Sequence, residues 1–140
     1  MKVEFKDNAV SISFEPLYMI NQCSKNESML WIKTDIHIHV DSAFVFETIE
    51  LNQTDYQSLY QSLCDRNNMN HSFSWETLEG TICFEMVKDQ EKYACSLNYI
   101  TNIEKNNYMH ITFSLYENDI NNIISELASI IDWIGLCGKS

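Results

Sequence analysis

Two histidines at alternate positions, His37 and His39, are the residues whose type and spacing come closest to a chemical site in this 140-residue sequence. In a β-strand both imidazoles point to the same side, about 7 Å apart. With His110 or Glu85 as a third ligand from a neighbouring strand, they would suit zinc. A His-x-His pair alone, however, lacks the remaining ligand spacing of a metal site, and histidine is an ordinary residue on an exposed strand face. We therefore expect no metal, and keep a small metal-binding or enzymatic domain that uses these histidines as an alternative.

The sequence gives little indication of a catalytic loop, because such loops usually need glycine and this chain contains few glycines. Gly80 is the only glycine before residue 135, so the chain contains neither a glycine-rich phosphate loop nor a Gly-x-Ser-x-Gly turn. Close carboxylates, such as Glu47 with Glu50 or Glu76 with Glu79, are able in principle to act as acid and base. With 20 acidic residues in the chain, such pairs arise by chance on a solvated surface. We predict a protein that is not an enzyme, with no catalytic residue and no cofactor.

The charge balance indicates the kind of partner. Nine Lys and Arg residues stand against 20 Asp and Glu residues, which gives a net charge of −11. General binding to nucleic acid depends on basic groups that displace counterions from phosphates, so nucleic acid is not an expected partner. An acidic domain suits a basic protein partner, because opposite charges speed association.

The sequence also predicts where the protein works. Its first residues alternate charged and apolar side chains and lack the apolar core of an export signal. No apolar run approaches the roughly 18–20 residues that cross a bilayer, so we expect no membrane span. An odd number of cysteines without a Cys-x-x-Cys motif favours a reducing compartment; they are Cys23, Cys64, Cys83, Cys95 and Cys137. We expect a cytoplasmic protein.

Hydrophobic periodicity predicts strands, a helix, strands and a second helix. Two-residue alternation indicates strands at 3–6, 10–15, 30–40, 43–51, 81–86, 93–99 and 109–115. Thr54 and Asp55 are typical of a helix start, with Thr54 as the N-cap and the helix running to about Asn67. A second helix follows Asn118 and Asp119 and ends near residue 135. We predict an α+β fold in a single domain, residues 1–140: an antiparallel sheet of about six or seven strands with two helices packed on one face.

The polar face of this sheet is the expected functional surface. In segment 30–40 the apolar positions have one parity, and Trp31, Asp35, His37 and His39 have the other. Trp31 among polar neighbours is typical of an aromatic anchor at an interface; the equal alternative is that it covers the sheet edge or lies under the first hairpin. Segment 43–51 is apolar on both parities, which is typical of a central strand or a strand with a bulge. The partner-binding residues we predict are Trp31, Asp35, His37 and His39.

The order of these features resembles a family of small bacterial immunity proteins, the WapI-like partners of WapA-type wall-associated toxins. The resemblance begins with a Trp-led strand, Leu30-Trp31-Ile32, which runs into a second strand with paired Phe. It continues through the Tyr- and Leu-containing helix of Asp55–Leu63 and a strand at Leu78–Phe84, and closes with Ile111–Leu127. The resemblance implies a non-enzymatic cytoplasmic protein that binds and blocks a cognate toxin domain.

A third interpretation also remains open, a structural or regulatory subunit that dimerises through its exposed sheet face or edge. For the immunity interpretation we expect a monomer or a weak homodimer that binds a basic toxin domain.

Overall fold

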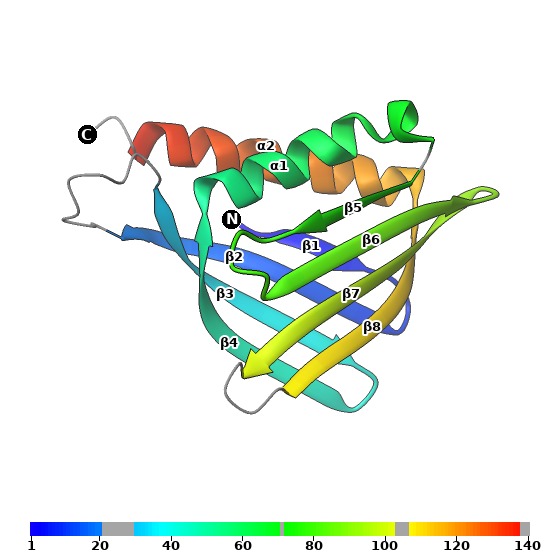
Figure 1. Cartoon of the computed structure of the whole chain (residues 1–140), viewed down its shortest axis with the longest axis horizontal. Helices are drawn as coiled ribbons and strands as arrows, with labels where there is room; N and C mark the ends of the chain where they lie inside the picture. Colours follow the sequence, from blue (N-terminus) through cyan, green and yellow to red (C-terminus); the bar gives the residue numbers. More distant parts are fainter. Residues whose placement is uncertain (21–29, 71, 103–106, 138–140) are drawn as a thin grey trace.

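The computed structural model describes residues 1–20, 30–70, 72–102 and 107–137, which form two antiparallel four-stranded sheets and two long helices (Figure 1). The first sheet has the order β1-β2-β3-β4, and the second has the order β5-β6-β7-β8. The first set of strands is β1 (Val3–Lys6), β2 (Val10–Ile20), β3 (Trp31–Val40) and β4 (Ala43–Asn52). The second set is β5 (Ser72–Glu76), β6 (Ile82–Asp89), β7 (Lys92–Asn102) and β8 (Asn107–Tyr116). Helix α1 (Gln53–Cys64) and a short 3₁₀ turn, η1 (Arg66–Met69), follow β4, and helix α2 (Glu117–Cys137) follows β8.

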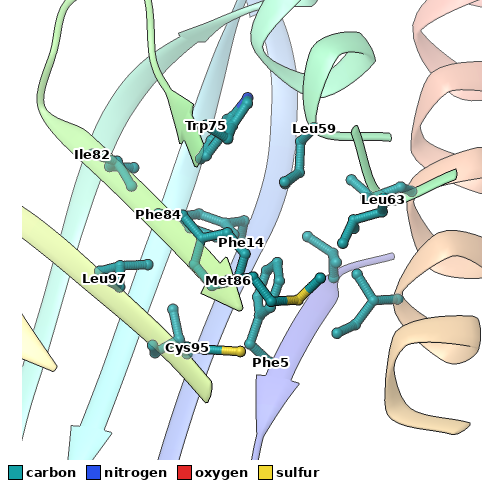
Figure 2. Packing of buried hydrophobic residues seen from close by; sticks show 14 of the residues in the cluster. Phe5, Phe14, Leu59, Leu63, Trp75, Ile82, Phe84, Met86, Cys95 and Leu97 are labelled. Atoms are coloured by element: carbon teal, nitrogen blue, oxygen red, sulfur yellow. The ribbon is translucent and has the colours of Figure 1, made fainter. Parts of the chain in front are cut away.

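The two-residue period of the strands gives each sheet one buried face, and the two buried faces meet. In β3, Ile32, Ile36 and Ile38 are fully buried. The ring of Phe5 in the first sheet lies 5.3 Å from the ring of Phe84 in the second, centroid to centroid. Aromatic rings at this separation pack favourably beyond the area that they bury. The sheets therefore share one hydrophobic core, part of which Figure 2 shows.

Both helices lie side by side along one end of the sheets (Figure 1), and each packs against the first strand of the other half of the chain. Helix α1 follows the first sheet but contacts β5, whereas α2 follows the second sheet but contacts β1. The apolar residues of α2 recur at helical spacing and face the core: Ile120, Ile123, Leu127, Ile130 and Ile134. This exchange of helices ties the two halves together.

Helix α2 corrects the expectation that no segment is long and apolar enough to cross a bilayer. It has 21 residues and contains a window with a mean hydropathy of 1.2, which meets the length and composition of a membrane-spanning helix. Its fully buried residues lie on the face that packs into the core, and polar residues such as Asn121, Asn122 and Ser129 are exposed on the other. A one-sided apolar stripe is typical of a helix that covers a protein core.

The α+β class and the antiparallel pairing are confirmed, but eight strands form two sheets rather than six or seven forming one. The strand that the periodicity missed is β5, which is short and has Ser72, Ser74 and Glu76 on its exposed side. Its buried side consists of two aromatics, Phe73 and Trp75. The second sheet, together with the helices, covers the apolar face of the first.

The start of α1 also differs from the prediction. The N-cap is Asn52, whose side chain accepts a hydrogen bond from the Thr54 N–H at 2.8 Å, so Thr54 is not the cap. The buried carboxylate of Asp55 completes a capping box by accepting from the Asn52 N–H, also at 2.8 Å. Its second oxygen accepts from the Leu78 N–H. Asp55 therefore links the helix start to the second sheet, a long-range bond that the local sequence does not encode.

Two polar contacts join the halves elsewhere. In the β1–β2 turn, one oxygen of Asp7 accepts from the Ala9 and Val10 N–H groups, and the other accepts from the Ser114 N–H of β8 at 3.1 Å. Arg66 in η1 forms an ion pair with Glu117 at the start of α2 and donates to the Leu63 carbonyl at 2.7 Å. Arg66, the single arginine of the chain, is buried and structural.

Candidate partner-binding surface

The outer face of the first sheet, which we call the β3–β4 face, contains the residues that the sequence predicted. Because the even-numbered residues of β3 point into the core, Trp31, Asp35, His37 and His39 all point outward. His39 is exposed, and the other three are half-buried. The prediction that these four side chains share one side of a strand agrees with the geometry.

Strand β4 adds two aromatic residues to this face that the sequence reasoning did not select. Phe44 is 62% exposed and Phe46 is 51% exposed, although both are large apolar side chains. The Phe46 ring meets the His37 imidazole edge-on, with centroids 4.5 Å apart. Phe44 lies 6.2 Å from both His37 and His39. The imidazoles are therefore part of an exposed aromatic cluster.

The expectation for segment 43–51 was wrong, and this explains why its Phe residues were passed over. It is an edge strand, and its register with β3 runs from Trp31–Asn52 to Val40–Ala43 without a bulge. The strand has apolar residues on both of its sides. One side faces the core, with Val45 and Ile49 half-buried, and the other side exposes Phe44 and Phe46. The two Phe residues were the available signal in the sequence. The register of the β3–β4 hairpin places Phe44 opposite His39 and Phe46 opposite His37.

Charged groups surround the aromatic cluster. Lys33 forms an ion pair with Glu50 at 3.0 Å, and the Thr48 hydroxyl donates to Asp35 at 2.6 Å. Beside His37, His39 and Phe44 is a shallow depression of about 420 Å³ that extends over β1 and β2 to Lys2, Glu4, Ser11, Ser13 and Glu15. An apolar centre with a polar rim is the usual composition of a protein–protein interface.

Trp31 lies at the far end of β3, where it pairs in register with Ile20 and Asn52. It is half-buried, so it presents only part of its ring to solvent. The structure brings His37, His39, Phe44 and Phe46 together in contact and leaves Trp31 at the border of the same face.

The third metal ligands that we considered do not reach the His37–His39 pair. His110 is exposed on β8 and makes a 2.5 Å hydrogen bond with Asn98, and Glu85 is exposed on β6. Both point away from the core on the second sheet, whereas the histidine pair points away from the core on the first. Within the described ranges, no three His, Cys, Asp or Glu side chains gather as metal ligands.

The first of the two carboxylate pairs is separated in the same way. Glu47 points toward the second sheet, where its carboxylate accepts a hydrogen bond from the Tyr99 hydroxyl, while Glu50 lies on the outer face. Since adjacent parities of a strand face opposite sides, these two residues cannot act on one substrate. Glu76 and Glu79 are both exposed.

The cysteines offer no reactive thiolate in the core. Burial, followed by the charge of Asp7, raises the pKa of the Cys95 thiol to about 12. Burial also raises the pKa of Cys83. The four described cysteines form no disulfide with one another, and Cys23 lies outside the described residues.

The outer face of the second sheet, the β6–β8 face, differs in composition. Its centre consists of small side chains, Ala94, Ser96, Thr112 and Ser114, which line a shallow depression of about 510 Å³ with Glu85 and Val87. Large exposed aromatics lie at its ends, with Tyr108 at 71% and Tyr116 at 57% exposure. The two outward faces of the molecule therefore present unlike chemistry.

Comparison with protein families identifies the chain. The model of the immunity protein WapI-like family matches residues 4–135, which include every strand except the first residue of β1 and almost all of both long helices. The chain belongs to the WapI-like immunity protein family. No curated protein matches it in sequence.

This WapI-like protein shares its fold with solved structures of distant sequence. The plant transcriptional regulator PBF-2 superposes with a TM-score of 0.52 at 9% identity, over 99% of this chain and 86% of that one. WHY1 from Arabidopsis thaliana superposes with a TM-score of 0.51 at 11% identity, over 94% of this chain and 88% of that one. At such identities the likeness concerns the fold alone, because one fold serves many functions.

Proposed function

We propose that this WapI-like protein is a non-enzymatic immunity protein that works in the cytoplasm by binding and blocking a cognate toxin domain. The observation that carries the proposal is the family match over residues 4–135. The charge and the site geometry are consistent with it. The net charge of −11 suits a basic partner, and the third metal ligands that we considered lie on a different sheet from the histidine pair.

We assign toxin binding to the β3–β4 face. Most interface energy comes from a few large side chains at the centre of a contact, surrounded by polar groups that exclude water. Phe44 and Phe46 supply exposed aromatic area, and His37 packs against Phe46. Trp31, Asp35 and His39 extend the contact around them. Because the strand already fixes the backbone that carries these side chains, binding requires no further ordering of the backbone.

Inhibition by binding predicts one-to-one stoichiometry. The test requires a toxin domain encoded beside this protein's gene, and it follows the activity of that domain while purified immunity protein is added. Activity should fall linearly to zero at one equivalent and should not depend on the time of preincubation once binding is complete. Cells that express the toxin should grow only when this protein is co-expressed.

Inhibition at a small fraction of an equivalent, increasing with preincubation time, would indicate an enzyme that modifies the toxin and would contradict the proposal. Failure to protect cells from the neighbouring toxin would contradict it as well.

A further inference from the structure

In the described part of the chain, two of the four sheet edges are short and covered, and a third is covered near one end. Strand β1 has only four residues, and the carboxylate of Glu126 in α2 accepts its Glu4 N–H at 3.2 Å. Strand β5 has five residues and packs against α1. Strand β8 donates its Ser114 N–H to the Asp7 carboxylate. Short edges and covered edges are the usual ways in which proteins prevent pairing with another chain.

The fourth edge, β4, has none of these protections. It is ten residues long, its register is uninterrupted, and it contains no Lys and no Pro. In the ranges that the structure describes, no strand pairs with its free side. The one inward-pointing charge, Glu47, is hydrogen-bonded by Tyr99 and turned away from the edge.

The ladder geometry shows which backbone groups the free edge offers. In an antiparallel pair, hydrogen-bonded positions alternate with positions that are not bonded. The Gln53 N–H donates to the Leu30 carbonyl at 2.8 Å, and this pair continues the β3–β4 register by one residue. Odd-numbered residues of β4 therefore bond to β3, and the even-numbered residues direct their N–H and C=O groups away from it. These are Phe44, Phe46, Thr48 and Glu50.

The same four residues place their side chains on the outer face, so one edge combines free backbone groups with the exposed aromatics. We infer that β4 binds an extended segment of the toxin as an added strand, with Phe44 and Phe46 as anchors beside the backbone hydrogen bonds. Main-chain bonds supply affinity in such pairing, and alternate side chains supply specificity. The inference rests on the proposed function and specifies its contact.

The charges near the edge describe the segment that fits. Asp35 and Glu15 are register partners, and within the described part of the chain no cation pairs with either of them. An added strand places its residue opposite Thr48 about 10 Å from Asp35, two strand spacings away, which is within reach of a Lys or Arg side chain. The segment therefore carries apolar side chains opposite the two Phe residues and a basic side chain opposite Thr48.

A second copy of this protein suits the edge less well, because two domains that each carry a net charge of −11 repel one another.

The test compares Thr48→Pro with Thr48→Val. Both variants lose the hydroxyl that donates to Asp35, but only Thr48→Pro loses the free N–H and gains a ring at the edge. Proline is tolerated at an edge position whose N–H faces away from the sheet, so both variants should fold, as circular dichroism and thermal melts will show. The probe is the same toxin domain, in a form made inactive by substitution. We expect Thr48→Pro to bind at least about tenfold more weakly than Thr48→Val.

Amide exchange of the wild-type protein supplies a second measurement that does not depend on a variant's folding. On binding the toxin domain, the amides of Phe44, Phe46, Thr48 and Glu50 should all gain protection, because each acquires a partner or is covered by the added strand. Equal binding by the two Thr48 variants, or unchanged exchange at these four amides in a complex that does form, would overturn strand addition and leave the immunity function intact. Absence of any binding by the wild type would overturn the immunity function itself. A stable dimer of the free protein that masks these amides would show that the occupant is a second copy.

Discussion

The β3–β4 face and the β6–β8 face come from halves with the same order of elements, four strands and then a helix, yet they expose different chemistry. Inward, both halves present apolar rows that meet in one core. Outward, the first presents a cluster of imidazoles and Phe rings, and the second presents Ser, Thr and Ala side chains at its centre, with Tyr108 and Tyr116 apart at its ends.

The difference between the two faces shows at which strand positions the stability of the fold does not determine the residue type. Burial determines the inward parity of every strand, since large apolar groups there are removed from water. The outward parity carries no such requirement, so exposed Phe44 and Phe46 need another explanation. A monomeric surface gains nothing from clustered aromatics, and such clusters are typical of interaction sites.

The largest expected effect tests whether the halves share one core. Leu127 is fully buried on α2, which belongs to the second half of the chain but packs against β1 of the first. We expect Leu127→Ala to lower the free energy of unfolding by about 2–5 kcal/mol. Denaturant melts should show a single transition by both tryptophan fluorescence and circular dichroism. A loss below about 0.5 kcal/mol, or two separate transitions, would show that the halves are independent.

The next prediction compares the two outer faces directly. Phe46→Ala removes an exposed aromatic from the β3–β4 face, and Val87→Ala removes a side chain that is 54% exposed on the β6–β8 face. We expect Phe46→Ala to weaken toxin binding by about 2 kcal/mol, as for a central anchor of an interface. Val87→Ala is the control for the second face at similar exposure, measured by calorimetric titration beside it. If Val87→Ala costs as much as Phe46→Ala, the assignment of the binding face is wrong.

A smaller effect is expected where the halves are joined by Asp7. Partial burial raises the pKa of this carboxyl, but the three backbone N–H groups that donate to it outweigh burial and hold the pKa below its usual value. Asp7→Asn should lower stability by about 1 kcal/mol at pH 7, the low end for bonds to a charged group, because the site is partly open to solvent.

The lowered pKa of Asp7 determines how the stability difference between wild type and Asp7→Asn changes with pH. A lowered folded-state pKa means that the stabilisation is complete above the unfolded-state pKa, near pH 4, and is lost as the pH falls through the folded-state value. The difference between wild type and Asp7→Asn should therefore be constant from pH 7 to about pH 5 and shrink below about pH 4. Urea melts at several pH values measure it, and a difference that grows on acidification would contradict the assigned bonds.

The smallest effect concerns association rates. Asp35→Lys on the β3–β4 face and Glu85→Lys on the β6–β8 face change the net charge equally, so their difference reports the local field. We expect Asp35→Lys to slow toxin association by about three- to tenfold at low salt, and Glu85→Lys to slow it less. Trp31→Ala should mainly speed dissociation. Stopped-flow rates at two salt concentrations decide this, and equal slowing by both charge reversals would mean that only the overall charge matters.

The sequence by itself determined what repeats over a few residues. The alternation of β3 placed Trp31, Asp35, His37 and His39 on one side, because a strand's two-residue period is a local property. The pattern after Asn118 and Asp119 likewise predicted helix α2 from the sequence. These local patterns, taken in order, were also enough to suggest the family that the comparison confirmed.

Only the tertiary structure decided which strands are neighbours and which edges stay free. Local periodicity is the same for a central strand as for an edge strand, so it did not show that β4 ends its sheet or that Phe44 and Phe46 are exposed. Nor did it show that His110 and Glu85 lie on the other sheet, away from His37 and His39. These outcomes depend on contacts between residues far apart in the chain, such as Phe5 with Phe84 and Asp7 with Ser114. Pairing is fixed by the total burial that all strands and helices achieve together, and no single segment of the sequence contains that information.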